Sequence, residues 1–337
     1  MPTDSSGITA AFIAGSFLYS DDVHSAGAIA ARLLLGVGGH MARYWFVLLT
    51  MVLALVPRIT AQDTTARLFH NFTVVPNITY LTASNYESKL DLYVTRTPER
   101  PLPTLIYIHG GGWVAETKEL RNLEVLPYLE MGMNVVNVDY RLAKIAQAPA
   151  AVEDARCALR WVISNAKQYG IDPARLVLAG GSAGAHLALL AAMLPPAAGF
   201  DRLCPGPDNL KVAAVVSWYG VTDLVEMMDL PSLPAATTWL GGNPDREQLA
   251  KRISPLTYVR AGLPPMFLVH SVTDPVVPYS QSVRLHEALN KVGVANELLT
   301  IPGGGHGYLC CNLTERLDAY RKIREFLTRH RVIGSSN

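Results

Sequence analysis

The chain has 337 residues, of which 50% are hydrophobic and 17% are charged, and its 29 Lys and Arg residues nearly balance its 28 Asp and Glu residues. So many apolar residues with so little net charge exclude a chain that is disordered throughout. The charge balance also leaves no basic excess for sequence-independent binding of nucleic acid. Four cysteines are too few for a small disulfide scaffold.

The first feature along the chain is an uncharged apolar run, Tyr44–Val56, preceded by a short positively charged segment. It is too short to cross a bilayer as a helix, which needs about 20 residues. A small residue, Ala61, follows it, as at the cleavage site of a secretory signal peptide. We therefore interpret 41–61 as a signal peptide and 1–40 as a non-native extension, which predicts a secreted or periplasmic protein without a stable membrane span. The alternative is an intact N-terminus with a membrane-associated or buried apolar segment.

Strand-like runs then alternate with helical runs over residues 62–337. The expected strands are 72–81, 89–94, 104–108, 134–138, 175–179, 212–217, 266–270 and 297–301. The expected helices are 151–169, 182–193, 280–292 and 313–330. This alternation predicts a single α/β domain, with a mostly parallel central sheet covered by helices on both faces. A stretch rich in Pro, Leu and Met, 223–261, interrupts the alternation and is interpreted as a small helical insertion over the carboxyl edge of the sheet.

A glycine-rich segment, His109–Trp113, follows one of the predicted strands and reads HGGGW. Backbone N–H groups that stabilise a developing oxyanion must approach it closely, and glycines leave room for that approach. We predict that Gly111 and Gly112 are such donors, with Gly110 as the alternative. We interpret His109 as a brace of the loop rather than as a base. A flexible loop without a function is the competing interpretation.

A second glycine-rich segment, Gly180–Gly184, has the pattern G-x-S-x-G between a predicted strand and an Ala- and Leu-rich helix. That setting is typical of a nucleophile elbow, in which a serine lies on a sharp turn. It predicts Ser182 as a nucleophile and the N–H group of Ala183 as an oxyanion donor. Side chains at either end of the motif would collide with neighbouring backbone. The alternatives are an ordinary βα turn or a phosphate-binding loop, but no Lys follows the serine as a P-loop requires.

The base and the acid are expected later in the chain, in the order Ser, Asp, His. His306 lies in a glycine-rich loop between the last predicted strand and the last helix, from which an imidazole can reach Ser182. Asp274 follows the strand 266–270 and would orient that imidazole. Asp223 is the alternative acid, because it follows an earlier strand at a similar depth. The other histidines are assigned structural roles.

Five aromatic residues flank the predicted catalytic loops: Trp113, Trp218, Tyr219, Trp239 and Tyr308. Of these, Trp113, Trp218 and Tyr219 are the candidate substrate contacts. Core packing is the alternative for Trp218.

The cysteines and histidines have no spacing that suits zinc, so we predict no metal and no cofactor. In an exported protein Cys204 is expected to pair with Cys310 or Cys311, whereas Cys157 lies inside a predicted helix and is interpreted as a core residue. The sequence alone does not establish the connectivity.

Several motifs in this order resemble a known group of enzymes. They are HGGGW (109–113), DYRLA (139–143), GGSAGAHLALL (180–190), VTDPVVPYSQS (272–282) and IPGGGHGY (301–308). Together they are similar to α/β-hydrolase fold esterases, namely the hormone-sensitive-lipase-like carboxylesterases and, in the Asp and His loops, the BD-FAE (feruloyl-esterase-like) branch. The resemblance covers about residues 72–330. It departs at 144–146, which read KIA where hormone-sensitive-lipase relatives have Pro-Glu.

The resemblance implies a serine hydrolase that cleaves small or carbohydrate-linked carboxylic esters through an acyl-enzyme on Ser182. Export would favour an extracellular substrate. One alternative is an arylformamidase-type amidase, which resembles the same HGG-W loop and would act on a cytosolic metabolite. Another is a non-catalytic binding module of the same fold. Such modules typically lose a member of the triad, whereas Ser182, Asp274 and His306 are all present here.

Overall fold

The computed structural model describes residues 71–96, 98–204, 206–207, 210–228, 230, 234–242 and 244–334. All of them belong to one compact unit, Thr65–Asn337. The interpretation of 1–40 and 41–61 as an extension and a signal peptide lies outside these residues and stays a prediction. In the part of the chain that the structure describes, no helix has both the length and the apolar character needed to cross a membrane.

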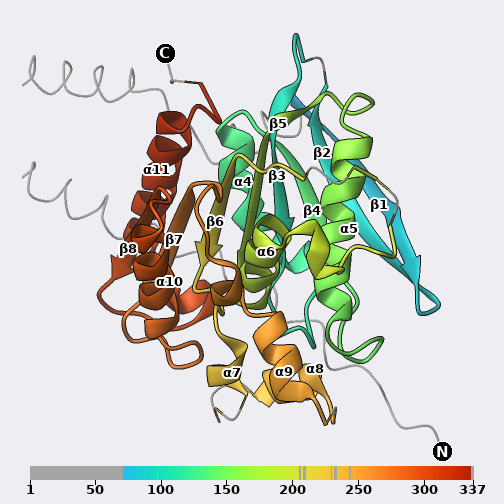
Figure 1. Cartoon of the computed structure of the whole chain (residues 1–337). Coiled ribbons are helices and arrows are strands. Elements are labelled where there is room, and N and C mark those ends of the chain that lie inside the picture. Colours follow the sequence, from blue (N-terminus) through green and yellow to red (C-terminus); the bar gives the residue numbers. More distant parts are fainter. Residues whose placement is uncertain are drawn as a thin grey trace, which may run out of the picture. The chain divides into compact units, whose positions relative to one another are not determined.

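Among the described residues, eight strands form one sheet in the order β1-β2-β4-β3-β5-β6-β7-β8 (Figure 1). The strands are β1 (Phe72–Ala83), β2 (Tyr86–Thr95), β3 (Leu102–Ile108), β4 (Asn134–Val138), β5 (Ile171–Gly181), β6 (Ala214–Trp218), β7 (Met266–Ser271) and β8 (Asn296–Ile301). The pairs β1–β2 and β2–β4 are antiparallel and all later pairs are parallel. The sequence prediction of a mostly parallel sheet is therefore confirmed.

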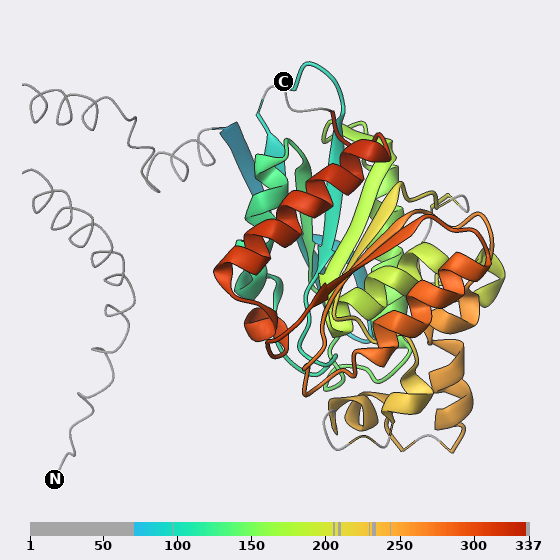
Figure 2. The same cartoon turned by 90° about the vertical axis from the view of Figure 1, so that its left-hand side faces the viewer.

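Helices cover both faces of the sheet (Figure 1 and Figure 2). They are α4 (Asn122–Glu130), α5 (Ala150–Ser164), α6 (Ala183–Met193), α10 (Ser280–Lys291) and α11 (Leu313–Arg329). The core is split by the pleat of the strands, because successive side chains point to opposite faces. In β3, Leu105 and Tyr107 pack in the cluster with α4 and α11, and Ile106 and Ile108 pack in the cluster with α5 and α6. Such a strand reads as a continuous apolar run because both of its faces are buried.

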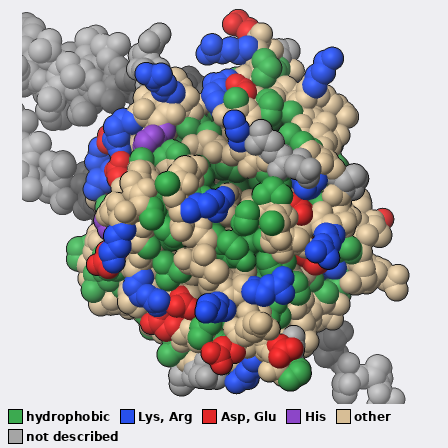
Figure 3. Space-filling view, viewed as in Figure 1, with side chains coloured by type: hydrophobic (Ala, Val, Ile, Leu, Met, Phe, Trp, Pro, Cys, Tyr) green, Lys and Arg blue, Asp and Glu red, His purple; other side chains and the backbone are tan. Residues whose placement is uncertain are grey.

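In the described part of the segment predicted to be an insertion, after β6, lie the short α-helices α7 (Leu224–Met227), α8 (Pro234–Leu240) and α9 (Arg246–Arg252). The insertion reaches the glycine-rich loop after β3, because a Cβ atom built on Gly112 would lie 2.7 Å from the Cβ of Ala235. The insertion therefore covers the edge of the sheet where the predicted catalytic loops meet. On the face seen in Figure 3, Lys and Arg side chains are interspersed with Asp and Glu.

Two of the helices differ from the sequence prediction. Helix α4 was not predicted, because Pro127 interrupts its pattern; the helix is instead stabilised by burying Val125, Tyr128 and Leu129 against the sheet. The helix expected to run to residue 169 ends at Ser164.

The expected partner of Cys204 is wrong. Cys204 forms a disulfide with Cys157, whose Cα atom is 5.5 Å away, and both Cys310 and Cys311 are free thiols. The interpretation of Cys157 as a core residue is confirmed, because only 1% of the residue is exposed and it packs in the core cluster with α5 and α6. A core position did not exclude a disulfide. Cys157 lies on α5, and the loop that follows α6 brings Cys204 to it.

Candidate active site

A strained turn between β5 and α6 presents Ser182. Its φ of 56° and ψ of −121° are a conformation that L-residues avoid unless the surrounding structure holds them there. The flanking glycines are required by space: a Cβ on Gly180 would lie 2.5 Å from the carbonyl oxygen of Ile108, and one on Gly184 only 2.0 Å from it. The N–H of Ser182 donates to the carbonyl of Trp218 at 2.9 Å, which ties the turn to β6. The collisions predicted for both glycines are confirmed.

The structure brings together the three residues predicted to act with one another. The Nε2 atom of His306 lies 2.9 Å from the Oγ of Ser182, and its Nδ1 atom lies 2.7 Å from the Oδ2 of Asp274. The other carboxylate oxygen of Asp274 accepts hydrogen bonds from the N–H groups of Val276 and Val277 at 2.8 and 3.0 Å. The Asp274 side chain is fully buried, whereas the His306 side chain is 18% exposed. Such an array can relay a proton from a serine hydroxyl to an imidazole.

The rival acid, Asp223, is not part of this array. Its carboxylate caps α7 by accepting from the N–H of Val225, and it forms an ion pair with Arg284.

His270 is a neighbour of the acid whose role sequence reasoning missed. Its Nδ1 atom lies 2.8 Å from the Oγ of Ser282, and its Nε2 atom lies 3.0 Å from the carbonyl of Val277 and 3.4 Å from the Oδ2 of Asp274. Burial by itself raises the pKa of Asp274, but hydrogen bonds to His270 and His306 outweigh it and hold the pKa well below its usual range. The acid therefore stays ionised in the interior.

Hydrogen bonds to its carbonyl groups hold the loop after β3 in place. The Tyr140 hydroxyl donates to the carbonyl of Gly110 at 2.6 Å, and the N–H groups of Val114 and Ala115 donate to the carbonyl of Gly111. In a trans peptide the C=O and the following N–H point in opposite directions. These contacts therefore fix the directions of the N–H groups of Gly111 and Gly112, the two predicted donors of this loop.

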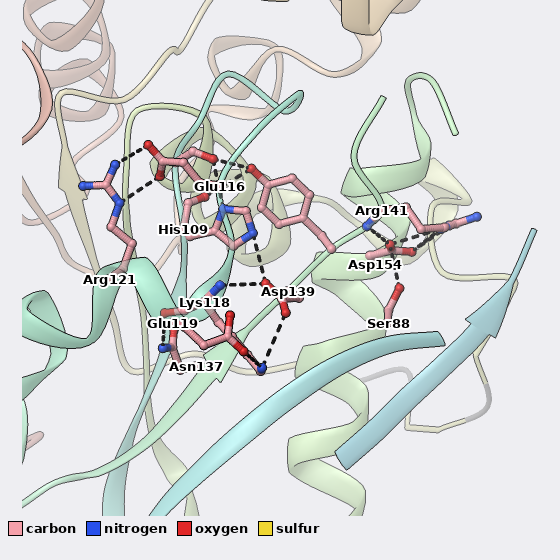
Figure 4. A network of polar contacts seen from close by, with 12 residues as sticks. Ser88, His109, Glu116, Lys118, Glu119, Arg121, Asn137, Asp139, Arg141 and Asp154 are labelled. Carbon is pink, nitrogen blue, oxygen red and sulfur yellow. Dashed lines mark hydrogen bonds and ion pairs between the residues drawn. The ribbon is translucent and has the colours of Figure 1, made fainter. Parts of the chain in front are cut away.

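A buried polar network supports the loop from below (Figure 4). The ring of His109 stacks on Tyr140 with centroids 4.4 Å apart, and its Nε2 atom lies 3.4 Å from the Oδ1 of Asp139. That Oδ1 atom also accepts the N–H of Lys118 at 2.7 Å, while the buried Lys118 ammonium lies 3.6 Å from Oδ2. His109 thus braces the loop, as predicted, and its Nδ1 atom is 3.1 Å from the carbonyl of Gly110.

Ser182 and His306 both line a cavity of about 250 Å³. It is lined by Tyr107, Gly110, Gly111, Gly112, Glu116, Arg121, Gly181, Ser182, Tyr219, Ala235, Val276, His306 and Gly307. Glu116 and Arg121 were missed by sequence analysis, because neither belongs to a motif. The Nε atom of Arg121 donates to Glu116 at 2.8 Å, so the two charges in the cavity wall compensate each other.

Of the predicted substrate contacts, Tyr219 lies at this cavity, with its ring centroid 4.8 Å from that of His306. Trp218 lines a neighbouring cavity of about 170 Å³ between α4 and α11 instead. The prediction for Trp113 is wrong: the residue is fully buried, stacks on Trp239 at 4.5 Å, and donates from Nε1 to the Nδ1 of His186 at 3.3 Å. Its positive φ of 62° turns the side chain into the core.

Comparison with known proteins gives a match to the BD-FAE family over residues 90–289. The chain belongs to the BD-FAE family. The matched range contains Ser182 and Asp274 but ends before His306, so the contact geometry alone places the histidine.

Curated relatives include esterase LipQ of Mycobacterium tuberculosis, which is 33% identical over 68% of this chain and 56% of its own length. Carboxylesterase NlhH of the same species is 32% identical over 62% of this chain and 67% of its own length. The chain spans about half the length of the first curated relatives that it matches.

Solved structures with the same architecture include a truncated carbohydrate esterase from gut microbiota, with a TM-score of 0.64 and 27% identity over 77% of this chain and 97% of that one. Another is the propionate-bound esterase Est2 of Thermogutta terrifontis, with a TM-score of 0.65 and 27% identity over 79% and 97%. The chain has the α/β-hydrolase fold.

Proposed function

We propose that this protein is a serine esterase that hydrolyses carboxylic esters through an acyl-enzyme on Ser182. The observation that carries the proposal is the continuous array from the Ser182 hydroxyl through His306 to the buried Asp274. The strained φ of Ser182 and the glycine loop beside it support the same chemistry. Curated relatives named as esterases and carboxylesterases add support by similarity.

In the proposed first step His306 takes the proton of Ser182 through Nε2 as the hydroxyl attacks the ester carbonyl. Asp274 holds the imidazole in the required tautomer and stabilises the imidazolium that forms. The N–H groups of Gly111, Gly112 and Ala183 are the proposed donors to the oxyanion, and α6 adds the positive end of its dipole there. The imidazolium then protonates the leaving alcohol, and water attacks the acyl-enzyme by the reverse sequence of proton transfers.

We propose short acyl esters, carried on small alcohols or on carbohydrates, as the substrates. The cavity that Ser182 lines has a volume of only about 250 Å³, which suits a small acyl group. The names of two similar structures, a carbohydrate esterase and an acetyl ester-xyloside bifunctional hydrolase, support this substrate class by similarity.

The test is hydrolysis of p-nitrophenyl acetate, of an acetylated xylo-oligosaccharide and of an N-formyl anilide by the wild type and by Ser182→Ala. We expect turnover of the two esters by the wild type and a fall of about 10⁴-fold or more in the variant. Equal rates for both proteins would refute the triad. Preference for the formanilide would favour the amidase alternative, and binding of the oligosaccharide without turnover would favour a binding module.

We also propose that the protein is exported after cleavage near Ala61. The apolar run Tyr44–Val56 supports this, and so does the disulfide Cys157–Cys204, since such bonds persist in oxidising compartments. N-terminal sequencing of the protein released from cells tests the proposal. A mature terminus upstream of Met41 would contradict it.

A further inference from the structure

Two adjacent thiols lie at the end of the loop that carries His306, and the proposed mechanism does not use them. The Sγ atoms of Cys310 and Cys311 are 2.9 Å apart, and only 3% and 6% of the two residues are exposed. We propose that these two thiols are a site of reversible oxidation, at which a vicinal disulfide closes and lowers the reactivity of Ser182.

Of the two thiols, Cys311 is the more readily ionised. Its hydrogen bond with Cys310 and, to a smaller degree, its contact with Arg316 lower the pKa of Cys311 to about 7, whereas the pKa of Cys310 is raised. A thiolate is the form that attacks an oxidant. Cys310 lines the cavity of about 170 Å³ between α4 and α11, which gives a small peroxide a route to the pair.

The reaction with a peroxide balances without any other reactant. The Cys311 thiolate attacks one peroxide oxygen, so that an S–O bond forms, the O–O bond breaks and hydroxide leaves. The Cys310 sulfur then attacks the sulfenic sulfur, so that the S–S bond forms, the S–O bond breaks and water leaves with the thiol proton. The two thiols lose two electrons, and the peroxide gains them.

Such a bond is strained and therefore easily reduced. Adjacent Cα atoms are about 3.8 Å apart across a trans peptide, whereas disulfides usually join Cα atoms about 4.4–6.8 Å apart. The Sγ atoms must also approach from 2.9 Å to about 2.05 Å, so closing this small ring changes the dihedral angles of Cys310 and Cys311 and displaces their backbone. Strained disulfides have more oxidising potentials and are the labile, regulatory ones.

That backbone movement reaches the His306 loop through contacts with the two residues that precede His306. A Cβ on Gly304 would lie 2.2 Å from the carbonyl oxygen of Cys310, so these backbones are tightly packed. The N–H of Gly305 donates to the carbonyl of Leu309 at 2.6 Å. A displacement of about 1 Å in a catalytic constellation can cost about 10²-fold in rate. We expect the oxidised protein to react ten- to a hundredfold more slowly.

The first measurement is peptide mapping by mass spectrometry, after treatment of the full chain with hydrogen peroxide and after dithiothreitol. The peptide that contains both thiols should lose two hydrogen masses on oxidation, resist alkylation, and regain both properties on reduction. This measurement does not depend on the proposed function. A peptide that stays reduced, or that carries added oxygen on each sulfur, would overturn the proposal.

The second measurement, which rests on the proposed function, is the rate at which a fluorophosphonate labels Ser182. We expect this rate to fall ten- to a hundredfold in the oxidised wild type and to recover with dithiothreitol. The double variant Cys310→Ser, Cys311→Ser is the control, because the same peroxide oxidises its methionines but cannot close the ring. An equal loss of labelling in the control, or a closed disulfide without any loss in the wild type, would overturn the link to His306. Failure of the reduced wild type to label would instead count against the esterase.

Discussion

The hydroxyl of Tyr140 gives a sharp test of how the oxyanion loop is positioned. Tyr140 is almost fully buried, and its hydroxyl donates to the carbonyl of Gly110 at 2.6 Å, on the peptide that carries the N–H of Gly111. The substitution Tyr140→Phe removes this donor and leaves the ring stacked on His109. The substitution does not change the charge of the protein. Burial raises the pKa of Tyr140 well above its usual value, so the phenol of the wild type is neutral.

The expected fall in kcat follows from the role of the hydrogen bond between Tyr140 and Gly110 in orienting one oxyanion donor. A single oxyanion donor is worth about 3 kcal/mol of barrier, and the lost hydrogen bond about 1 kcal/mol of loop stability. The Gly110 carbonyl keeps its contact with the ring of His109 at 3.1 Å, so the peptide is loosened rather than released. We therefore expect about half of one donor to be lost, which is about 1.4 kcal/mol or a tenfold fall in kcat. KM should stay the same, because the donors act on charge that develops only in the transition state.

The assay is steady-state hydrolysis of p-nitrophenyl acetate by the wild type, Tyr140→Phe and the matched control Tyr93→Phe. The Tyr93 hydroxyl contacts the side chain of Asn122 at 3.0 Å, away from the loop, and its removal should leave kcat unchanged. Urea unfolding of all three proteins separates stability from catalysis. An unchanged kcat in Tyr140→Phe, or an equal fall in both variants, would refute the positioning role.

Three further predictions concern stability. Burial lowers the pKa of His186 to about 4, whereas the same group in the unfolded chain has a pKa near 6.5. Between these two pH values the unfolded chain binds more protons, so the unfolding free energy should fall by about 3 kcal/mol from pH 6.5 to pH 4. Urea titrations should show a smaller fall in His186→Gln. Gly184→Ala should abolish folding or lower the unfolding free energy by more than about 3 kcal/mol, because its Cβ would lie 2.0 Å from a carbonyl oxygen. The control Gly242→Ala places its Cβ in open space and should leave the unfolding free energy unchanged. Equal melting temperatures for the two variants would contradict this. Loss of the disulfide through Cys157→Ala should lower the unfolding free energy by about 4 kcal/mol, given its sequence separation of 47; an unchanged urea midpoint would count against this.

The arrangement of strands was predictable because it depends on local patterns. Strands buried on both faces read as apolar runs, and residues such as Ile106 could only be placed in a core. Helix α4 was missed because its stability comes from packing against the sheet and not from its own sequence, which contains Pro127. Tertiary burial decided that element, and no local pattern reports it.

The array of Ser182, Asp274 and His306 was predictable for a different reason. Each residue lies in the segment that follows a parallel strand, and the carboxyl ends of such strands meet at one edge of the sheet. Strand order therefore converts positions far apart in the chain into neighbours. Their catalytic roles stay a prediction until a variant is measured.

The residues that support the catalytic loops could not be predicted from strand order, because their contacts depend on the direction in which each side chain points. Trp113 belongs to the same motif as Gly111, yet a positive φ turns it into the core, where it donates to the Nδ1 of His186. That contact requires the proton of the neutral ring to be on Nε2, which lies 2.7 Å from the carbonyl of Ile253 just after the insertion helix α9. Protonation of Nδ1 would break the link to Trp113. The insertion and the oxyanion loop are thus joined through one buried imidazole, and acid should loosen both together.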